Sequence, residues 1–338
     1  MNLRQAAAEI TVVGAGSWGT ALAIQCARAG RHTRLWGRDV ALMHELARAR
    51  CNARYLPQAP FPPNLEISAS LADAIRGTED VLVVVPSSGF RAQLQLLAPL
   101  LAPEQRLCWA TKGFELSTGL LPHQVVREVF GATRPTAVLS GPTFAREVGS
   151  GLPTAMTIAS ADENYAAGLA NDISSPTFRA YTSGDIVGVE VGGAVKNVLA
   201  IGAAFSDGLG YGANARIAMI TRGLAEMMRL GLALGAQRDT FMGLACLGDL
   251  VLTCTDDQSR NRRFGLMLAR GLSVADAQRD IGQVVEGYHA AHAVREVAQR
   301  LKVWMPIADG IYRVLFEGLP VEQVVQRLME QPVRAEFD

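Results

Sequence analysis

Lysine is scarce in this chain, and one of its lysines lies in an apolar setting. The sequence contains 29 arginines but only three lysines, Lys112, Lys196 and Lys302. Lys196 follows small and apolar residues at 192–195, in a stretch whose pattern predicts a helix. An ammonium group can release its proton when its surroundings disfavour charge, whereas a guanidinium stays protonated. These features indicate acid–base chemistry at Lys196; a solvated lysine on a helix surface is the alternative.

Three consecutive polar residues, Ser259, Arg260 and Asn261, have the composition of a phosphate site. The planar guanidinium of Arg260 can donate two hydrogen bonds to a phosphate, and a helix predicted to begin near Asn261 adds backbone N–H donors. An ordinary basic helix face, shared with the next arginines, is the alternative. Shortly before this triplet, Asp249 could orient an ammonium or accept a hydrogen bond from a substrate hydroxyl, and a carboxylate there needs such a partner.

A glycine-rich turn near the start of the chain has the pattern G-x-G-x-x-G, from Gly14 to Gly19. It follows a predicted strand at 9–13 and precedes a predicted helix at 20–29. In a dinucleotide site, Gly14 permits the tight turn, Gly16 lets the backbone approach the pyrophosphate, and Gly19 allows close helix–strand packing. The sequence therefore predicts a dinucleotide site here, with a purely structural glycine turn as the alternative.

The end of the second predicted strand bears on which dinucleotide is bound. Arg38 and Asp39 follow it, about twenty residues after the last glycine of the turn. An acidic residue at this place binds the ribose diol of NAD, whereas an arginine favours the 2′-phosphate of NADP. Because Arg38 comes first, we expect NADP(H) to be favoured, with NAD(H) also possible. An exposed Arg–Asp pair without a cofactor role is the alternative.

The elements that must position these residues change in character along the chain. Up to about residue 189, short apolar strands alternate with helices, which predicts a doubly wound, mostly parallel α/β sheet. From residue 190 onward the pattern is helical almost throughout, apart from two predicted loops at 206–214 and 247–261. We therefore expect a Rossmann domain over 1–189 and an all-helical substrate and catalytic domain over 190–338. The predicted strands are 9–13, 33–36, 80–85, 107–110, 136–139, 155–159 and 178–181.

Composition narrows the class of protein. A chain of 338 residues is long enough for two domains, and its 32 acidic and 32 basic residues leave no net charge to attract nucleic acid. Residues 1–9 lack the apolar core of a signal peptide, and no stretch predicts a membrane span. The five cysteines have no C-x-x-C spacing, which favours reduced thiols and a cytoplasmic location. No metal site is expected.

Taken together, these motifs closely resemble the bacterial-type NAD(P)-dependent glycerol-3-phosphate dehydrogenases. The resemblance extends over essentially the whole chain, and its longest stretches are 192–203, 214–230, 248–265 and 281–288. It implies reversible reduction of dihydroxyacetone phosphate to sn-glycerol 3-phosphate, which supplies glycerophospholipid synthesis. It also implies a small phosphorylated substrate, and we expect a homodimer.

The resemblance also implies a role for each site residue. Lys196 would be the catalytic acid–base, with Lys112 and Asp249 beside it in the catalytic group. The residues that would bind the substrate are Lys112, Gly141, Thr143, Lys196, Asp249, Ser259, Arg260 and Asn261. Those that would bind the cofactor are Gly14, Gly16, Ser17, Trp18, Gly19, Arg38, Lys112, Ala145, Arg260, Val284 and Glu286.

Two other readings of the sequence stay open. One is a different dehydrogenase that pairs a Rossmann domain with a helical domain and acts on a small hydroxy acid, 6-phosphogluconate or ketopantoate. The phosphate triplet beside Lys196 argues against it. The other is a non-catalytic dinucleotide sensor, which would leave Lys112, Lys196 and Asp249 without a purpose.

Overall fold

The computed structural model describes residues 10–330, and the chain divides into two compact units. The first unit contains the chain up to Glu115 together with Leu120–Glu190. The second contains Leu116–Gly119 and the chain from Val191 onward. The chain therefore passes between the units three times. Glu9, at the start of the first predicted strand, lies outside the described residues, as does the rest of the segment 1–9 in which no signal peptide is expected.

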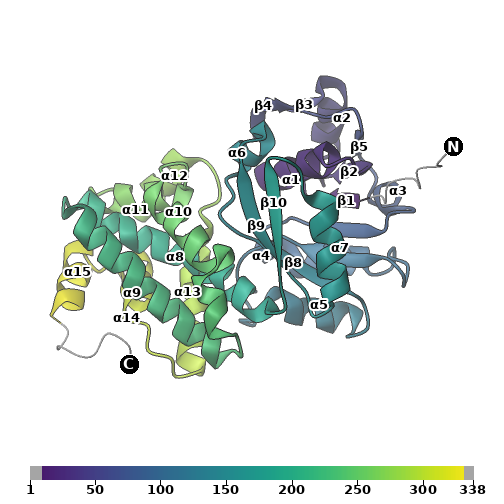
Figure 1. The fold of residues 1–338 in the computed structure, drawn as a ribbon. Coiled ribbons are helices and arrows are strands. Elements are labelled where there is room, and N and C mark those ends of the chain that lie inside the picture. Colours follow the sequence, from purple (N-terminus) through teal and green to yellow (C-terminus); the bar gives the residue numbers. More distant parts are fainter. Residues whose placement is uncertain (1–9, 331–338) are drawn as a thin grey trace. The chain divides into compact units, whose positions relative to one another are not determined.

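The first unit is built on an eight-stranded sheet (Figure 1). Its strand order is β10-β9-β8-β7-β6-β1-β2-β5, and every neighbouring pair is parallel except β8 and β9. The Rossmann-type fold class predicted from the sequence is confirmed. The strands are β1 (Ile10–Val13), β2 (Thr33–Trp36), β5 (Leu65–Ser68), β6 (Asp80–Val83), β7 (Arg106–Trp109), β8 (Thr136–Ser140), β9 (Thr154–Ala159) and β10 (Phe178–Ser183).

Seven helices and a small hairpin complete the described part of this unit. The helices are α1 (Ser17–Arg28), α2 (Val40–Ala49), α3 (Leu71–Ile75), α4 (Ser87–Leu97), α5 (Pro122–Phe130), α6 (Ala145–Ser150) and α7 (Glu163–Ile173). The hairpin joins β3 (Cys51–Asn52) to β4 (Leu56–Pro60). β3, β4 and β5 are absent from the prediction. β6 ends two residues before its predicted end, because the chain turns there toward Pro86, which precedes α4.

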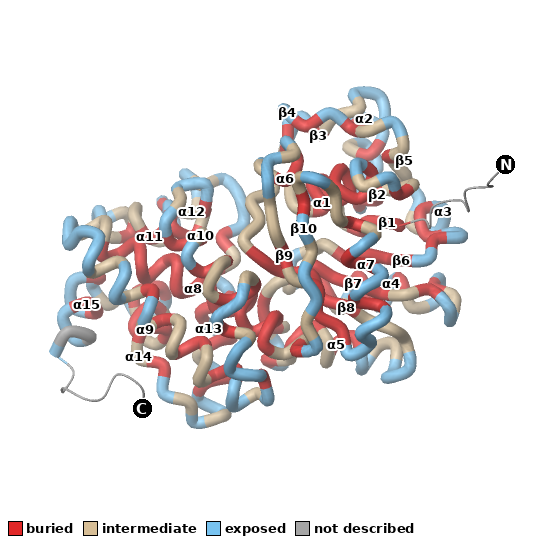
Figure 2. The backbone as a smooth tube through the Cα atoms, in the orientation of Figure 1, coloured by how far each residue is buried: buried red, intermediate tan, exposed pale blue. Residues whose placement is uncertain are grey.

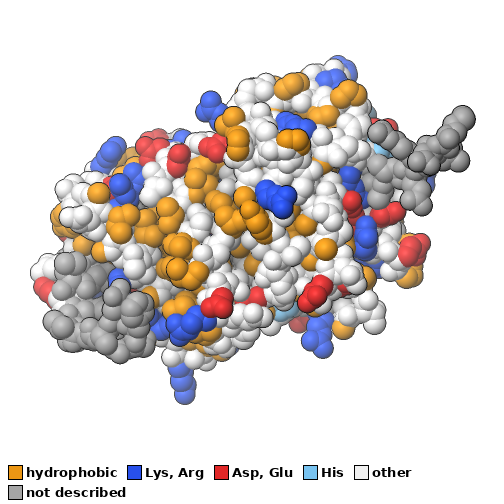
Figure 3. Space-filling model, in the orientation of Figure 1, with side chains coloured by type: hydrophobic (Ala, Val, Ile, Leu, Met, Phe, Trp, Pro, Cys, Tyr) orange, Lys and Arg blue, Asp and Glu red, His pale blue; other side chains and the backbone are white. Residues whose placement is uncertain are grey.

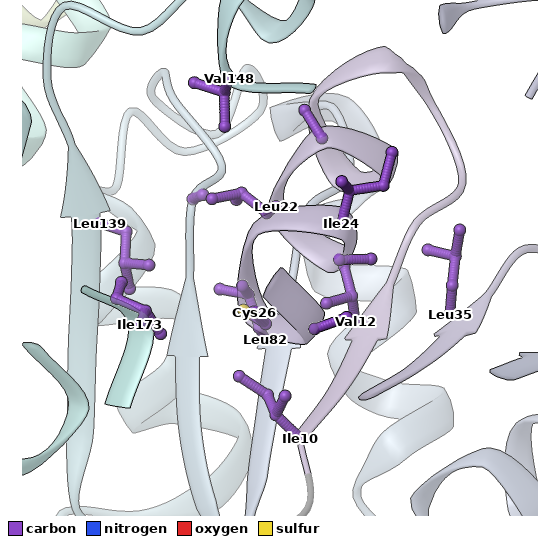
Figure 4. Packing of buried hydrophobic residues seen from close by; sticks show 14 of the residues in the cluster. Ile10, Val12, Leu22, Ile24, Cys26, Leu35, Leu82, Leu139, Val148 and Ile173 are labelled. Carbon is purple, nitrogen blue, oxygen red and sulfur yellow. The ribbon is translucent and has the colours of Figure 1, made fainter. Parts of the chain in front are cut away.

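Apolar packing between β1 and α1 forms the centre of this unit's core (Figure 4). Ile10 and Val12 of β1 and Leu22 and Ile24 of α1 are fully buried or nearly so. Removing each such side chain from water contributes about 1.5–3 kcal/mol. This packing holds the start of α1 beside the carboxyl end of β1, which is where the glycine turn must place a bound diphosphate.

The second unit is helical, and its main buried element is α8, whose first five residues belong to the first unit (Figure 2). Most residues of α8 are apolar, which is typical of a helix surrounded by protein. By length and composition α8 could cross a membrane, but 89% of its most apolar window is buried inside the protein. The helices are α8 (Ile186–Gly208), α9 (Gly212–Ala233), α10 (Asp249–Thr255), α11 (Arg260–Ala269), α12 (Val274–Ile281), α13 (Glu286–Arg300), α14 (Pro306–Glu317) and α15 (Val321–Met329).

The two predicted loops are mostly helical, so that prediction is wrong. Helices α8 and α9 leave only residues 209–211 between them. The segment 247–261 contains the end of a π-helical turn (Leu244–Gly248), all of α10 and the start of α11. β-branched residues such as Val251, Thr253 and Thr255 have weak helix propensity, which concealed α10 in the sequence. Burial of Leu250, Thr253 and Cys254 supplies the stabilisation that propensity does not.

A buried carboxylate of α9 holds the start of α14. Glu226 is almost completely buried, and its two oxygens accept the backbone N–H groups of Ile307 (2.7 Å) and Ala308 (3.1 Å). Burial raises the pKa of Glu226 to about 7, although these two hydrogen bonds oppose the increase. The folded protein therefore keeps a proton on Glu226 at pH values where the unfolded chain has released it.

We predict that this group makes the protein less stable as pH rises from about 4.5 to 7. A carboxyl whose pKa is higher in the folded state loses its stabilising contribution across that window, here by about 3 kcal/mol at most. Glu226→Gln, which cannot titrate, should remove this part of the pH dependence. Urea unfolding at pH 5 and pH 8 measures the effect. An equal pH dependence in the two proteins would contradict it.

Candidate active site

The glycine turn between β1 and α1 has the geometry of a diphosphate cradle. Gly14 has φ +127°, a conformation that other residues rarely adopt. A Cβ on Gly19 would lie 1.8 Å from the Gly14 carbonyl oxygen, so helix and turn could not approach as they do. Gly16, by contrast, is exposed and has open space where a Cβ would be. No side chain caps α1, which leaves its first N–H groups to an anion.

The other residues predicted near the cofactor in this unit differ in exposure. Ser17 and Trp18 open α1 and are half-buried, and the indole Nε1 of Trp18 is buried without a hydrogen-bond partner. Arg38 is exposed after β2. Asp39 caps α2, because its Oδ1 accepts the backbone N–H of Leu42 at 3.0 Å. The carboxylate that would bind a ribose diol therefore already has a structural partner.

Three predicted substrate residues lie together at the carboxyl ends of β7 and β8. The ammonium of Lys112 lies 3.4 Å from the Gly141 carbonyl oxygen, and the Thr143 hydroxyl donates to the same oxygen at 3.2 Å. Ala145 begins α6 two residues later. Adjacent strands of the sheet thus bring residues 112, 141 and 143 to one place, as a crevice at the carboxyl edge of a parallel sheet requires.

The lysine singled out by the sequence lies inside the helical unit with a carboxylate partner. Lys196 is 8% exposed and Asp249 is 1% exposed. The Lys196 ammonium forms an ion pair with Oδ1 of Asp249 and donates to the Thr253 hydroxyl at 3.1 Å. A carboxylate at this place favours the protonated form of the amine, since it offsets the cost of burying the charge. Lys196, Asp249 and Thr253 therefore form one buried polar group inside the helical unit.

Sequence reasoning missed Thr253, although a signal for it exists. Thr253 follows Asp249 by four residues, and such pairs share one face of a helix. Because 247–261 was predicted to be a loop, the helical spacing of Asp249 and Thr253 could not be used to pair them. The neighbouring thiol of Cys254 is no rival base, because burial raises its pKa to about 12 and keeps it protonated.

A glycine on α8 explains how the ion pair can form. Gly192 lies one turn before Lys196, on the same face of the helix. A Cβ on Gly192 would lie 2.5 Å from Sγ of Cys246 and 2.7 Å from the Ala245 carbonyl oxygen. Only glycine lets α8 approach the π-helical turn this closely. Because α10 begins directly after that turn, Asp249 comes within reach of Lys196.

The predicted phosphate triplet lies at the start of α11, but its side chains are partly occupied. Ser259 caps the helix by accepting the Arg262 backbone N–H at 3.2 Å. The Asn261 amide donates to Oδ1 of Asn197 (3.0 Å) and accepts the Gly287 backbone N–H (2.8 Å). These contacts leave the Arg260 guanidinium and the backbone N–H groups of Arg260 and Asn261 as the donors best suited to a phosphate.

The two arginines at the start of α11 differ in the contacts they make within the protein. Arg262 forms ion pairs with Asp207 and Asp257, so its guanidinium supports the fold. Arg260, half-buried, donates to the Gln283 side chain at 3.1 Å.

The two predicted cofactor residues that precede and open α13 also differ. Glu286 accepts a hydrogen bond from the Asn197 amide at 3.1 Å, which ties α13 to α8. Val284 is exposed. Asn197 was not among the predicted residues, although it is adjacent to Lys196.

The candidate residues thus form two sets, one in each unit. Among residues 10–330, no three His, Cys, Asp or Glu side chains are arranged to hold a metal ion. The first unit contains Gly14, Gly16, Ser17, Trp18, Gly19, Arg38, Lys112, Gly141, Thr143 and Ala145. The second contains Lys196, Asp249, Ser259, Arg260, Asn261, Val284 and Glu286.

Comparison with known families assigns both units. Residues 9–166 match the N-terminal part of NAD-dependent glycerol-3-phosphate dehydrogenase, and residues 185–326 match its C-terminal part. The chain belongs to this family. Proteins named glycerol-3-phosphate dehydrogenase [NAD(P)+] from Shigella boydii and Escherichia coli are each 54% identical to it over 330 residues, 97% of either chain.

A solved structure agrees with this assignment. The crystal structure of a glycerol-3-phosphate dehydrogenase from Coxiella burnetii, 44% identical, superposes with a TM-score of 0.93 and covers 97% of this chain and 100% of its own. The family resemblance found in the sequence is confirmed, and with it the use of a nicotinamide dinucleotide. Members of this glycerol-3-phosphate dehydrogenase family thus share the scaffold on which both sets of residues lie.

Proposed function

We propose that this chain catalyses the reversible NAD(P)H-dependent reduction of dihydroxyacetone phosphate to sn-glycerol 3-phosphate. The observation that carries the proposal is the buried group of Lys196, Asp249 and Thr253 within a scaffold of this family. In this proposal, residues 1–189 bind the dinucleotide, and residues 190–338 supply the acid–base and phosphate-binding groups. The product would enter glycerophospholipid synthesis in the cytoplasm.

Lys196 acts as the acid in the direction of reduction. When bound, a nicotinamide dinucleotide would supply the hydride that C2 of the substrate receives, and negative charge would then develop on the carbonyl oxygen. The Lys196 ammonium donates its proton to that oxygen, which completes the hydroxyl and leaves a neutral amine. Asp249 keeps the amine protonated beforehand, and the Thr253 hydroxyl fixes its direction. A positioned acid of this kind contributes about 100- to 10,000-fold to rate.

The phosphate end of the substrate is assigned to the start of α11. Arg260 supplies a charged fork, and the backbone N–H groups of the first turn add the positive end of the helix dipole. A hydrogen bond to a charged group is worth about 1.5–3 kcal/mol. Ser259 and Asn261 serve the site by holding the helix start in place. Lys112, Gly141 and Thr143 are assigned to the substrate as well.

NADP(H) is the cofactor we propose to be favoured. Arg38 is exposed two residues after the end of β2, where it can contact a 2′-phosphate. Asp39, the residue that would favour NAD(H), uses its carboxylate to cap α2. Ser17, Trp18, Ala145, Val284 and Glu286 are proposed to line the remainder of the dinucleotide.

The decisive experiment compares substrates and cofactors in one assay. We expect oxidation of NADPH with dihydroxyacetone phosphate and little or none with unphosphorylated dihydroxyacetone. NADPH should be preferred over NADH by about tenfold, and Arg38→Ala should abolish that preference, since it removes a charge-assisted contact. Arg48→Ala, an exposed arginine of the same unit, is the control. Cofactor binding without turnover of any substrate would refute the proposal and favour the sensor.

Lys196→Ala tests the acid–base role. We expect the variant to fold and to bind NADPH normally, while its kcat falls by about 100- to 10,000-fold. Lys302→Ala, an exposed lysine in the same unit, is the matched control and should keep full activity. Circular dichroism and NADPH fluorescence check folding and binding. A kcat for Lys196→Ala close to that of the unaltered protein would remove this residue from the mechanism.

We also propose that the chain forms a homodimer through α9. Ile217 and Leu232, about four turns apart on α9, are 53% and 38% exposed, and nearby Met242 is 68% exposed. Figure 3 shows hydrophobic side chains gathered over this helix. Exposed apolar patches of this kind mark association surfaces.

Sedimentation velocity tests the dimer. The unaltered protein should sediment as two chains and Ile217→Asp largely as one, because a charge is costly in an apolar interface. Val40→Asp, at an equally exposed apolar position in the first unit, should not change the mass. A single-chain mass for the unaltered protein would rule the dimer out.

A further inference from the structure

One buried carboxylate on α8 has no part in the reaction as proposed above. Glu190 lies in the second turn of α8 and is 4% exposed. It belongs to the first unit, and the division between the units follows it directly. Burial raises the pKa of Glu190, so the position is costly for a charge. A carboxylate at such a position requires contacts that compensate for its burial.

The carboxylate of Glu190 is surrounded by N–H donors. Its Oε1 accepts the indole N–H of Trp109 at 2.9 Å and the backbone N–H of His123 at 2.9 Å. Its Oε2 lies 2.5 Å from Nδ1 of His123. Trp109 is itself fully buried, with its ring edge-on to Phe90. These contacts join the start of α8 to β7 and to the start of α5.

The two elements joined here lead to two residues of the proposed site. Trp109 is the last residue of β7, and Lys112 follows three residues later. Glu190 precedes Lys196 by six residues on one continuous helix, a rise of about 9 Å. A single carboxylate is thus bonded to the strand that leads to Lys112 and is part of the helix that carries Lys196. A movement of the start of α8 would be transmitted along the helix to Lys196.

We propose that Glu190 is a positioning residue for the reaction, and that it fixes the direction and rotation of the helix bearing Lys196. The inference rests on the proposed function of Lys196. Misplacing a catalytic group by about 1 Å can reduce rate by roughly 100-fold. Loss of this anchor should therefore lower kcat and leave cofactor binding nearly unchanged.

Glu190→Gln separates a positioning role from a role for the negative charge. The Gln amide oxygen can still accept the N–H groups of Trp109 and His123, as Oε1 does now. The amide nitrogen would replace Oε2 and can donate to Nδ1 of a neutral His123 ring. Glu190→Ala retains none of these bonds. If Glu190 acts by positioning α8, Glu190→Gln should therefore retain activity. If its negative charge is what matters, Glu190→Gln should lose activity as Glu190→Ala does.

The experiment measures two quantities in Glu190→Ala and Glu190→Gln. In Glu190→Ala, kcat with dihydroxyacetone phosphate should fall by about 10- to 100-fold, while the Kd for NADPH stays within about twofold. Amide hydrogen exchange over residues 191–199 of α8, which needs no turnover, should become at least about tenfold faster. Glu190→Gln should restore both to within about threefold. Glu45→Ala, an exposed glutamate of α2, is the control.

Each outcome decides the proposal. Unchanged kcat and unchanged exchange in Glu190→Ala would overturn it, as would Glu190→Gln damaged as severely as Glu190→Ala. If the unaltered protein has no turnover, the proposed reaction fails, while exchange still reports whether Glu190 anchors α8. If Glu190→Ala does not fold, Trp109→Phe can be tested instead. This variant removes the indole N–H that Glu190 accepts and keeps an aromatic ring at the position. Trp109→Phe should lower kcat by about threefold or more, and an unchanged kcat in this variant would overturn the proposal.

Discussion

The helical unit depends on one constraint, which is that an ammonium group in its interior must be neutralised. An unpaired buried charge would cost several kcal/mol, so Lys196 requires a carboxylate within reach. Asp249 meets this need as the first residue of α10, which places its carboxylate against the Lys196 ammonium. The absence of a side chain at Gly192 allows the close approach. The glycine at position 192 and the start of α10 directly after the π-helical turn together allow this pairing.

The sequence was sufficient to predict the fold class and most elements of the sheet. Strands such as Ile10–Val13 are short runs of mostly apolar residues buried along their whole length, and they contrast clearly with the helices between them. The weaker elements were not predictable in this way. β4 contains two prolines and makes a two-stranded hairpin, so it lacks the pattern of a central strand. α10 has low helix propensity and depends on packing.

For the site, sequence identified residues whose type is unusual for their setting but could not identify their partners. Lys196 is conspicuous because lysine is scarce and its neighbours are apolar. Thr253, Asn197 and Glu190 are ordinary residue types, and only the fold reveals what they contact. Sequence also predicted that the side chains of Ser259 and Asn261 hold phosphate. The structure instead gives both side chains partners within the protein. Whether they also contact a ligand stays a prediction.

The surroundings of the lysines have a consequence for chemical labelling. Lys302 follows the end of α13 in a left-handed conformation and is exposed, whereas Lys112 is half-buried and Lys196 is almost fully enclosed. Amine-directed reagents should therefore attach to the side chain of Lys302 well before those of the other two. The protein then offers a nearly unique handle for dyes, surfaces or crosslinkers, at the end of α13 opposite to the one where Glu286 lies.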